Sequence, residues 1–207
     1  MKKIKDKRKF RIIFLGAGFS KPAGLPLASE LWDELLKRSD TLSGRAEKFH
    51  SDIEKYIAFK NNCDGLDLKK GSINFEEFIG FLDIEHFLGL RGSDTWSVDG
   101  NEGQVVIKTL IGEILTQYMP SPKDIPDIYL KFASELQPQD HVVTFNYDVL
   151  LERSLDVIGK PYRLFPNRYQ TIGKYVSTID SSKDEVIILK LHGSIHGCPN
   201  VEGIRSE

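Results

Sequence analysis

The sequence predicts an α/β domain in which a parallel β-sheet carries helices on both faces and a helical insertion interrupts the alternation of strands and helices. Short apolar runs rich in β-branched residues occur near both ends of the chain, as expected for strands buried in a parallel sheet. Each run ends in glycine or polar residues, whereas the middle of the chain has apolar residues at helical spacing. These observations describe a Rossmann-like sheet, and 207 residues fit one domain.

The first predicted strand covers residues 10–15 (FRIIFL) and leads into the turn Gly16–Ser20. A helix is expected after this turn, because apolar residues recur at i, i+3, i+4 and i+7 from Ala28 to Leu35. The chain therefore begins with a strand, a glycine turn and a helix.

Residues 40–130 are predicted to form a mostly helical insertion beside the sheet. Two apolar stripes have helical spacing, one beginning at Phe75 and one at Val106. Between them, residues 91–103 (RGSDTWSVDGNEG) are polar and rich in turn formers, which predicts a loop. No strand is expected in this part of the chain.

Strand and helix alternate again toward the end of the sequence. Residues 140–146 (DHVVTFN) form the second predicted strand, residues 149–158 (VLLERSLDVI) a helix that stops at Gly159, and residues 185–191 (EVIILKL) the third strand. In an open α/β sheet, ligands bind at the carboxyl ends of the strands. The polar residues that follow these strands are therefore the candidate site.

Charge and cysteine content exclude several classes of protein. The net charge of −2 gives no overall electrostatic attraction for nucleic acid, although residues 1–11 alone carry seven Lys/Arg and one Asp. The only expected route to nucleic acid is this basic tail, taken as residues 1–9. Two cysteines, Cys63 and Cys198, are too few for a four-thiolate zinc site or a disulfide scaffold. No apolar run is long enough for a membrane span or a signal peptide, so a cytoplasmic protein without a membrane partner is expected.

The glycine turn has two interpretations. Gly16-x-Gly18 between a strand and a helix is the arrangement of a phosphate cradle, in which the backbone and a helix N-terminus bind the anion. The third glycine of a dinucleotide fingerprint is replaced by Lys21, and the chain has no Gly-Lys-Ser/Thr sequence. An ordinary dehydrogenase and a P-loop NTPase are therefore disfavoured, and a simple tight turn is the alternative.

The two later motifs also have structural interpretations. Asp148 suits the N-terminal cap of the following helix, and Asn146 tolerates a turn. His192-Gly193-Ser194 fits a turn that closes a strand. All three motifs nevertheless follow predicted parallel strands, so an amide, a carboxylate and a histidine would meet the glycine turn at one sheet edge.

These motifs carry a resemblance to a known family. Gly16-Ala17-Gly18-Phe19-Ser20 followed by Gly24-Leu25-Pro26, then Thr144-x-Asn146-x-Asp148, then Lys190-Leu191-His192-Gly193-Ser194, resemble the motifs of the sirtuin family in order and spacing. The chain is most similar to the divergent sirtuin-like branch found in bacterial anti-phage defence proteins.

The resemblance implies a single NAD-binding domain over residues 1–207 that cleaves the nicotinamide–ribose bond of NAD. It implies that Asn146 orients the ribose or the attacking water and that His192 is the general base. It further implies that NAD contacts come from the residues around them: Gly16, Ala17, Gly18, Phe19, Ser20, Thr144, Asp148, Gly193 and Ser194. Asp148 would bind the nicotinamide carboxamide. A homo-oligomer or a partner defence protein would control the activity.

Departures from the family pattern narrow this expectation. Sirtuin deacylases carry a four-cysteine zinc module after the His-Gly motif, whereas only Cys198 follows it here. The resemblance therefore favours NAD hydrolysis or cyclisation over protein deacylation, with no zinc or other metal. The sequence ends at Glu207, 15 residues after His192, where the family continues with further strands. A truncated fold is expected on this ground, and a non-catalytic sensor of NAD or ADP-ribose is the alternative function.

Overall fold

The computed structural model describes residues 11–39, 46–90, 102–138, 140–164, 169–173, 176–179 and 184–194. The predicted basic tail, most of the predicted loop 91–103, and Cys198 lie outside these residues. The chain divides into two compact units. The first, here the sheet unit, contains Met1–Leu25 and Met119–His196, and the second, the helical unit, contains Pro26–Tyr118 and Gly197–Glu207.

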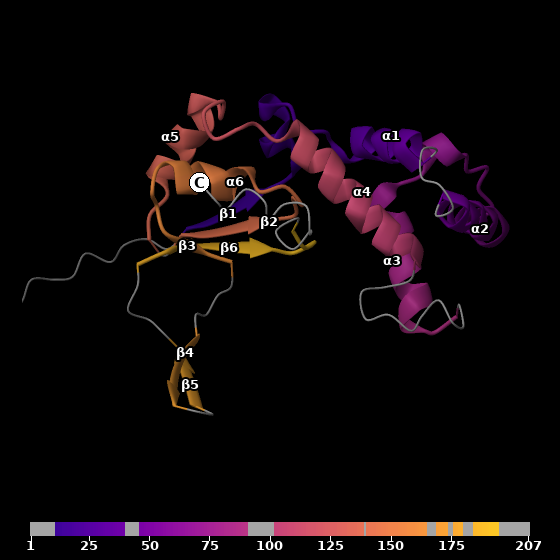
Figure 1. Cartoon of the computed structure of the whole chain (residues 1–207). Helices are drawn as coiled ribbons and strands as arrows, with labels where there is room; N and C mark the ends of the chain where they lie inside the picture. Colours follow the sequence, from indigo (N-terminus) through magenta and orange to yellow (C-terminus); the bar gives the residue numbers. More distant parts are fainter. Residues whose placement is uncertain are drawn as a thin grey trace, which may run out of the picture. The chain divides into compact units, whose positions relative to one another are not determined.

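The sheet unit is built on parallel strands in the order β1-β2-β6-β3 (Figure 1). Their bounds are Ile12–Leu15 for β1, His141–Thr144 for β2, Tyr162–Arg163 for β3 and Val186–Lys190 for β6. The predicted α/β class with a Rossmann-like parallel sheet is confirmed.

The strands that precede the three motifs end at the same level. Leu15 pairs with Thr144, and Thr144 pairs with Lys190. Two further backbone hydrogen bonds extend this ladder beyond the strands, from Phe145 N–H to the Leu15 carbonyl (3.3 Å) and from Leu191 N–H to the Thr144 carbonyl (2.9 Å). The residues after β1, β2 and β6 therefore leave the sheet along one edge.

Helices α5 (Asp127–Glu135) and α6 (Leu150–Val157) cover one face of this sheet (Figure 1). The core between them consists of Ala133, Leu136, Val142, Leu151, Leu155, Val186 and Ile188. On the other face, Ile12 and Phe14 of β1 are exposed, Phe14 to 68%. Among the described residues of the sheet unit, α5 and α6 are the helices that pack on the sheet, whereas α1 (Ala28–Ser39) belongs to the helical unit.

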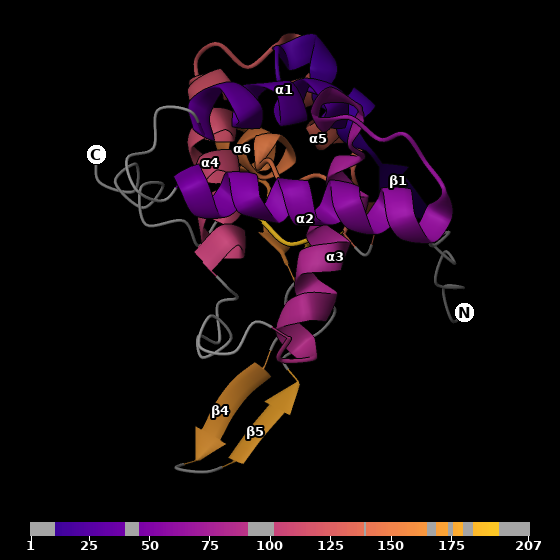
Figure 2. The ribbon, with the colours of Figure 1, turned by 90° about the vertical axis from the view of Figure 1, so that its right-hand side faces the viewer.

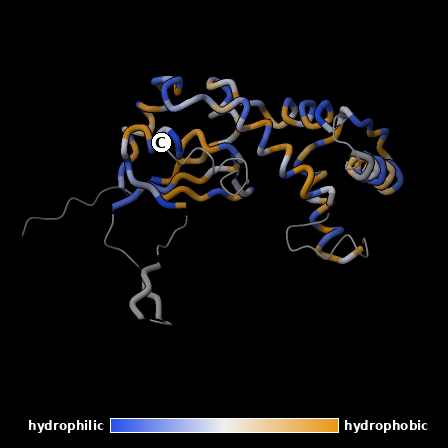
Figure 3. Tube along the Cα trace, in the orientation of Figure 1, coloured by the Kyte–Doolittle hydropathy of each residue, from blue (hydrophilic) through white to orange (hydrophobic). Residues whose placement is uncertain are grey.

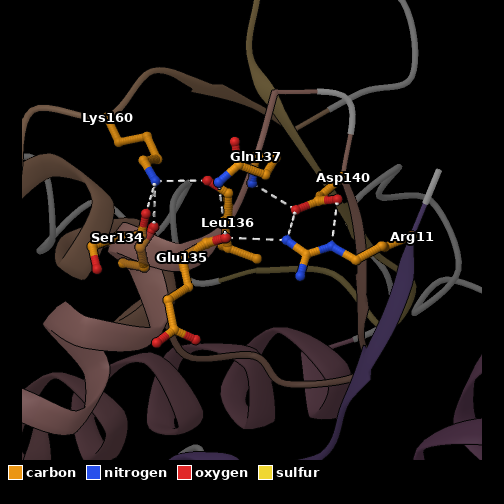
Figure 4. Close-up of polar contacts among 8 residues, drawn as sticks. Arg11, Ser134, Glu135, Leu136, Gln137, Asp140 and Lys160 are labelled. Carbon is orange, nitrogen blue, oxygen red and sulfur yellow. Dashed lines mark hydrogen bonds and ion pairs between the residues drawn. The ribbon is translucent and has the colours of Figure 1, made fainter. Parts of the chain in front are cut away.

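A polar cluster braces the amino-terminal edge of the sheet (Figure 4). The Arg11 guanidinium donates to both carboxylate oxygens of Asp140 and to the Glu135 carbonyl. Lys160 Nζ donates to three carbonyls at the end of α5, those of Ala133, Ser134 and Leu136. A cation at a helix C-terminus satisfies carbonyls that have no partner in the helix and complements its dipole. The cluster thus joins α5 to the starts of the strands.

This cluster shifts the titration of its members. Burial pushes the pKa of Asp140 up, but hydrogen bonds from Arg11 and from the Gln137 N–H outweigh it, so the pKa lies below its ordinary value. Burial lowers the pKa of Lys160. The carboxylate at 140 is therefore held in its charged form.

An antiparallel hairpin of β4 (Tyr169–Gly173) and β5 (Val176–Ile179) also belongs to the sheet unit (Figure 2). No strand was predicted between the helix at 149–158 and the strand at 185–191. β3, β4 and β5 are therefore additions to the predicted fold. β3 pairs with β6 through Tyr162 and Arg163 alone, a segment too short to show a periodic pattern.

The helical unit contains α1, α2 (Ala46–Asp64), α3 (Phe75–Phe87) and α4 (Glu102–Tyr118) (Figure 2). Hydrophobic and hydrophilic positions alternate along these helices, as burial of one side requires (Figure 3). Trp32 packs against the rings of Phe49, Phe75 and Phe78. The helices predicted within residues 40–130 are present. None of the helices in the described part of the chain is long and apolar enough to cross a membrane.

Candidate functional site

The candidate site lies in the sheet unit, at the edge where β1, β2 and β6 end. The level strand ends bring the three segments that follow them to this edge, namely Gly16–Ser20, Phe145–Asp148 and Leu191–Ser194. This is the edge at which open α/β sheets bind ligands. The sequence-predicted site residues all fall within these segments, apart from Thr144, which is the last residue of β2.

The glycine turn is a short 3₁₀ turn. The Phe19 N–H donates to the Gly16 carbonyl (2.9 Å), and the Ser20 N–H donates to the Ala17 carbonyl (3.1 Å). The Phe19 ring packs edge-on against Tyr129 of α5, and the Tyr129 hydroxyl donates to the Phe19 carbonyl (2.8 Å). The turn is therefore anchored to α5 on its inner side.

Glycine at positions 16 and 18 is not required by the protein itself. Gly16 has an extended backbone with φ of −115°. A Cβ added at Gly16 or Gly18 would meet no protein atom within 4 Å, and both residues are exposed. The absence of side chains therefore leaves open space on the outer side of the turn, which is compatible with close approach of a ligand to the backbone.

The helix predicted from the spacing of Ala28 to Leu35 is present as α1, but it does not begin directly after the glycine turn, so the phosphate-cradle interpretation lacks its adjoining helix N-terminus. A second 3₁₀ turn, Lys21–Ala23, follows, and α1 begins only at Ala28, in the helical unit. Pro22 and Pro26 explain the delay, because proline has no N–H and disfavours helical conformation in the residue before it. Backbone N–H groups of the 3₁₀ turn, without an α-helix dipole, are what the turn offers to a phosphate.

Asn146 is the most constrained polar side chain of the edge. Its backbone N–H donates to Thr144 Oγ1 (3.1 Å), and its side-chain Nδ2 donates to Ser20 Oγ (3.1 Å). The side chain is buried, with 8% of the residue exposed, and its Oδ1 has no hydrogen-bond partner among the described residues. A buried amide oxygen without a partner is costly, and it is the position where a donor from a ligand would be satisfied.

Asp148 shapes the turn that follows. Its Oδ1 accepts a hydrogen bond from the Leu150 N–H (3.0 Å) at the start of α6. This is the local bonding expected of an aspartate ahead of a helix. The carboxylate is buried, and Oδ2 remains for a further donor. The N-cap of α6 is Val149, so the expectation of Asp148 as the N-cap is wrong by one residue, although Asp148 still bonds the first helical N–H.

A buried ion pair lies beneath this turn. Lys190, the last residue of β6, donates through Nζ to Glu152 Oε1 of α6 (2.9 Å) and to the backbone carbonyl of Asp148. The two side chains are 6% and 2% exposed. Neither residue was predicted to have a role. A lysine at the end of an otherwise apolar strand (VIILK) was the signal for the pair.

His192 lies at the outer side of the edge and is exposed. Its ring contacts Phe145 (centroids 5.1 Å apart, edge-on) and Tyr147 (6.0 Å, tilted), the two residues that flank Asn146. Gly193 has φ of +91°, a conformation that favours glycine, and Ser194 is half-buried. The turn after β2 and the turn after β6 therefore touch through these rings.

The predicted residues thus form two groups at one edge. Ser20, Thr144 and Asn146 make one buried hydrogen-bonded set, and His192 packs beside it on the aromatic neighbours of Asn146. Among the residues that the structure describes, no group of three or more His, Cys, Asp and Glu side chains is placed to hold a metal ion. The chemistry available at the edge consists of an amide, a carboxylate, an imidazole and open backbone.

Comparison with known proteins agrees with the motifs. Residues 140–202 match the family model of the SIR2-like domain. The match includes β2, α6, β6 and the His192 motif, and begins after the glycine turn. The predicted sirtuin-like resemblance is confirmed for this part of the chain, and a SIR2-like domain indicates a function connected with NAD. No curated protein matches the chain.

Proposed function

We propose that the protein cleaves the bond between nicotinamide and ribose in NAD and releases nicotinamide and ADP-ribose or a cyclic product. The observation that carries this proposal is Asn146: a buried amide at the strand-end edge, held by Ser20 and Thr144, with its Oδ1 left for a ligand. A ribose hydroxyl is a donor that would satisfy this oxygen.

The reaction needs little more than orientation and a base. The C1′–N bond breaks through an oxocarbenium-like ribose, as in glycoside hydrolysis, and its electron pair leaves with nicotinamide as a neutral molecule. No general acid is required. In hydrolysis, a water oxygen bonds to C1′ and passes a proton to His192, because histidine is the side chain most often used as a general base near neutral pH. In cyclisation, the adenine ring of the same molecule replaces water as the nucleophile.

The remaining residues bind and place the substrate. The exposed backbone of Gly16–Gly18 would accommodate the phosphates, and Asp148 Oδ2 would accept from the nicotinamide carboxamide. Phe19, Ser20, Thr144, Gly193 and Ser194 complete the proposed binding surface. The net charge of −2 gives no attraction for an anionic dinucleotide, so binding depends on these local contacts.

The test is nicotinamide release from NAD by the purified protein, measured by chromatography. His192→Ala and Asn146→Ala should each lower kcat by at least about 100-fold, the effect expected for loss of a base or of substrate orientation. His50→Ala on α2 is the matched control, since His50 lies in the helical unit. If the wild type binds NAD or ADP-ribose but releases no nicotinamide, alone or with a partner, NAD cleavage is contradicted. The alternative function, a non-catalytic sensor, would then be favoured.

The anti-phage role and control by a homo-oligomer or partner protein belong to the same proposal. Uncontrolled loss of NAD would be toxic to the cell, so activity should depend on a trigger. Cells that express the protein should keep their NAD until phage infection and then lose it, and the His192→Ala variant should keep NAD throughout. Constant NAD levels after infection in both cases would exclude this role.

A further inference from the structure

The Lys190–Glu152 pair is buried beneath the candidate site, and the proposed chemistry does not use it. Removing two charges from water costs several kcal/mol per ion, and apolar residues of similar volume often stabilise a fold as well or better. Val186 and Ile188, which precede Lys190 on the same face of β6, are apolar core residues. Stability alone therefore gives no reason for a lysine at the end of this strand.

The position of the pair at the start of α6 does not explain the presence of a lysine either. The ammonium of Lys190 lies at the start of α6, where it bonds the Asp148 carbonyl and the first-turn residue Glu152. The N-terminus of a helix carries positive dipole, so a cation there is unfavourable. Glu152 offsets that cost.

The bonds of this ammonium connect the parts that carry the site. Lys190 ends the strand that leads to His192, and the Asp148 carbonyl closes the turn that carries Asn146. Leu150 and Asp148 are joined by the Asp148 Oδ1 bond, so the same turn runs directly into α6. One side chain therefore fixes the turn after β2 against the end of β6.

We infer that Lys190 is a positioning residue for the candidate site and that its bond to Glu152 holds the ammonium in place. The ammonium holds the Asn146–Asp148 turn in the position at which both side chains meet the substrate. This inference rests on the proposed NAD cleavage for its kinetic consequence, but the position of the turn is measurable without turnover.

The experiment uses three variants of the full chain. Glu152→Gln keeps an oxygen that accepts from Lys190, and it should retain kcat within about threefold. Lys190→Met leaves a buried carboxylate without its partner and should be unstable. The double variant Lys190→Met/Glu152→Leu removes both charges and should fold with a Tm no lower than wild type. Its kcat should still fall about 100-fold, the consequence of a misplaced turn.

A second ion pair on the same strand supplies the control. Glu185, directly before β6, pairs with Arg163 of β3 (3.6 Å) at the opposite end of the strand. Arg163→Met/Glu185→Leu should leave kcat unchanged, because this pair lies at the end of β6 opposite to Lys190.

Hydrogen exchange measures the turn itself. In the double variant at 152 and 190, the amides of Asn146 and Leu150 should exchange faster, while those of Val142 and Ile188 in the core should not change. Wild-type kcat and exchange in that variant, or failure of that variant to fold, would overturn the inference. If the wild type releases no nicotinamide, the proposed function fails, and the exchange comparison alone decides whether Lys190 positions the turn.

Discussion

The starts and the ends of the strands in this sheet differ in how completely their polar groups are bonded. At the starts of the strands, Arg11 donates to both carboxylate oxygens of Asp140, and Lys160 donates to three backbone carbonyls at the end of α5. At the ends, Asn146 is buried, as Asp140 is at the starts, and well held, yet its Oδ1 has no partner among the described residues. Two buried side chains thus differ: both carboxylate oxygens of Asp140 are bonded within the protein, whereas one oxygen of Asn146 is left open among the described residues.

The difference separates groups that stabilise the fold from groups that are available for a ligand. A fully bonded cluster contributes to stability, and its removal leaves buried carbonyls or charges without partners. An orphaned amide oxygen costs stability and is kept only where something else selects for it. Variants at the two edges should therefore affect different measurements.

The largest effect on stability is expected from Lys160→Met at the amino-terminal edge. The variant loses the three hydrogen bonds to the end of α5, and the free energy of unfolding should fall by about 2–3 kcal/mol, as for hydrogen bonds to a charged group. Urea unfolding measures this change. Nicotinamide release below the melting temperature should be unaffected, and a large fall in kcat with unchanged stability would remove the contrast between the edges.

The second largest effect on stability is expected from acid, which should destabilise the same amino-terminal edge. The pKa of Asp140 in the folded protein lies below its ordinary value of 3.8, whereas in the unfolded chain it is close to that value. The charged carboxylate therefore contributes stability at pH values above about 4, and this contribution is lost as pH falls through the folded pKa. Asp140→Asn should be less stable at pH 7 and should lose less stability between pH 5 and pH 2. Parallel pH profiles of the two proteins would contradict this assignment.

The smallest effect on stability is expected from Gly18→Ala at the glycine turn. An added Cβ meets no protein atom, so the free energy of unfolding should change by no more than about 0.5 kcal/mol. If the open backbone serves the phosphates, the Kd for NAD should rise about tenfold, equivalent to ~1.4 kcal/mol. Gly71→Ala in the helical unit, also with open space around it, is the control and should alter neither quantity. An unchanged Kd in Gly18→Ala would show that the open backbone of the glycine turn does not contribute to NAD binding.

Much of this edge was predictable because buried parallel strands leave a strong trace in the sequence. FRIIFL, DHVVTF and VIILKL each have an apolar, β-branched centre, and each leads directly into its motif. The placement of Asn146 and His192 at one edge follows from parallel pairing alone. The bond from Asn146 to Ser20 does not, because it joins positions 20 and 146 through tertiary packing.

Other features depend on context that a single sequence does not display. β3 is two residues long and exists only because β6 lies beside it. The apolar spacing from Ala28 predicted α1 where it begins, whereas the 3₁₀ turn Lys21–Ala23 before it, which contains Pro22, was not expected. Glu30 accepts from the Leu27 N–H (2.7 Å), which marks the true beginning of that helix.

The level ends of β1, β2 and β6 have a consequence for how such a protein can diverge. Residues 26–118 are inserted between β1 and β2, yet the groups at the edge lie within a few residues of strands that pair directly. Doubling the length of a connecting segment adds only about 0.6 kcal/mol of closure entropy. The insert can therefore be lengthened, shortened or exchanged during evolution while the chemistry stays in register, so that new control elements can be acquired without rebuilding the site.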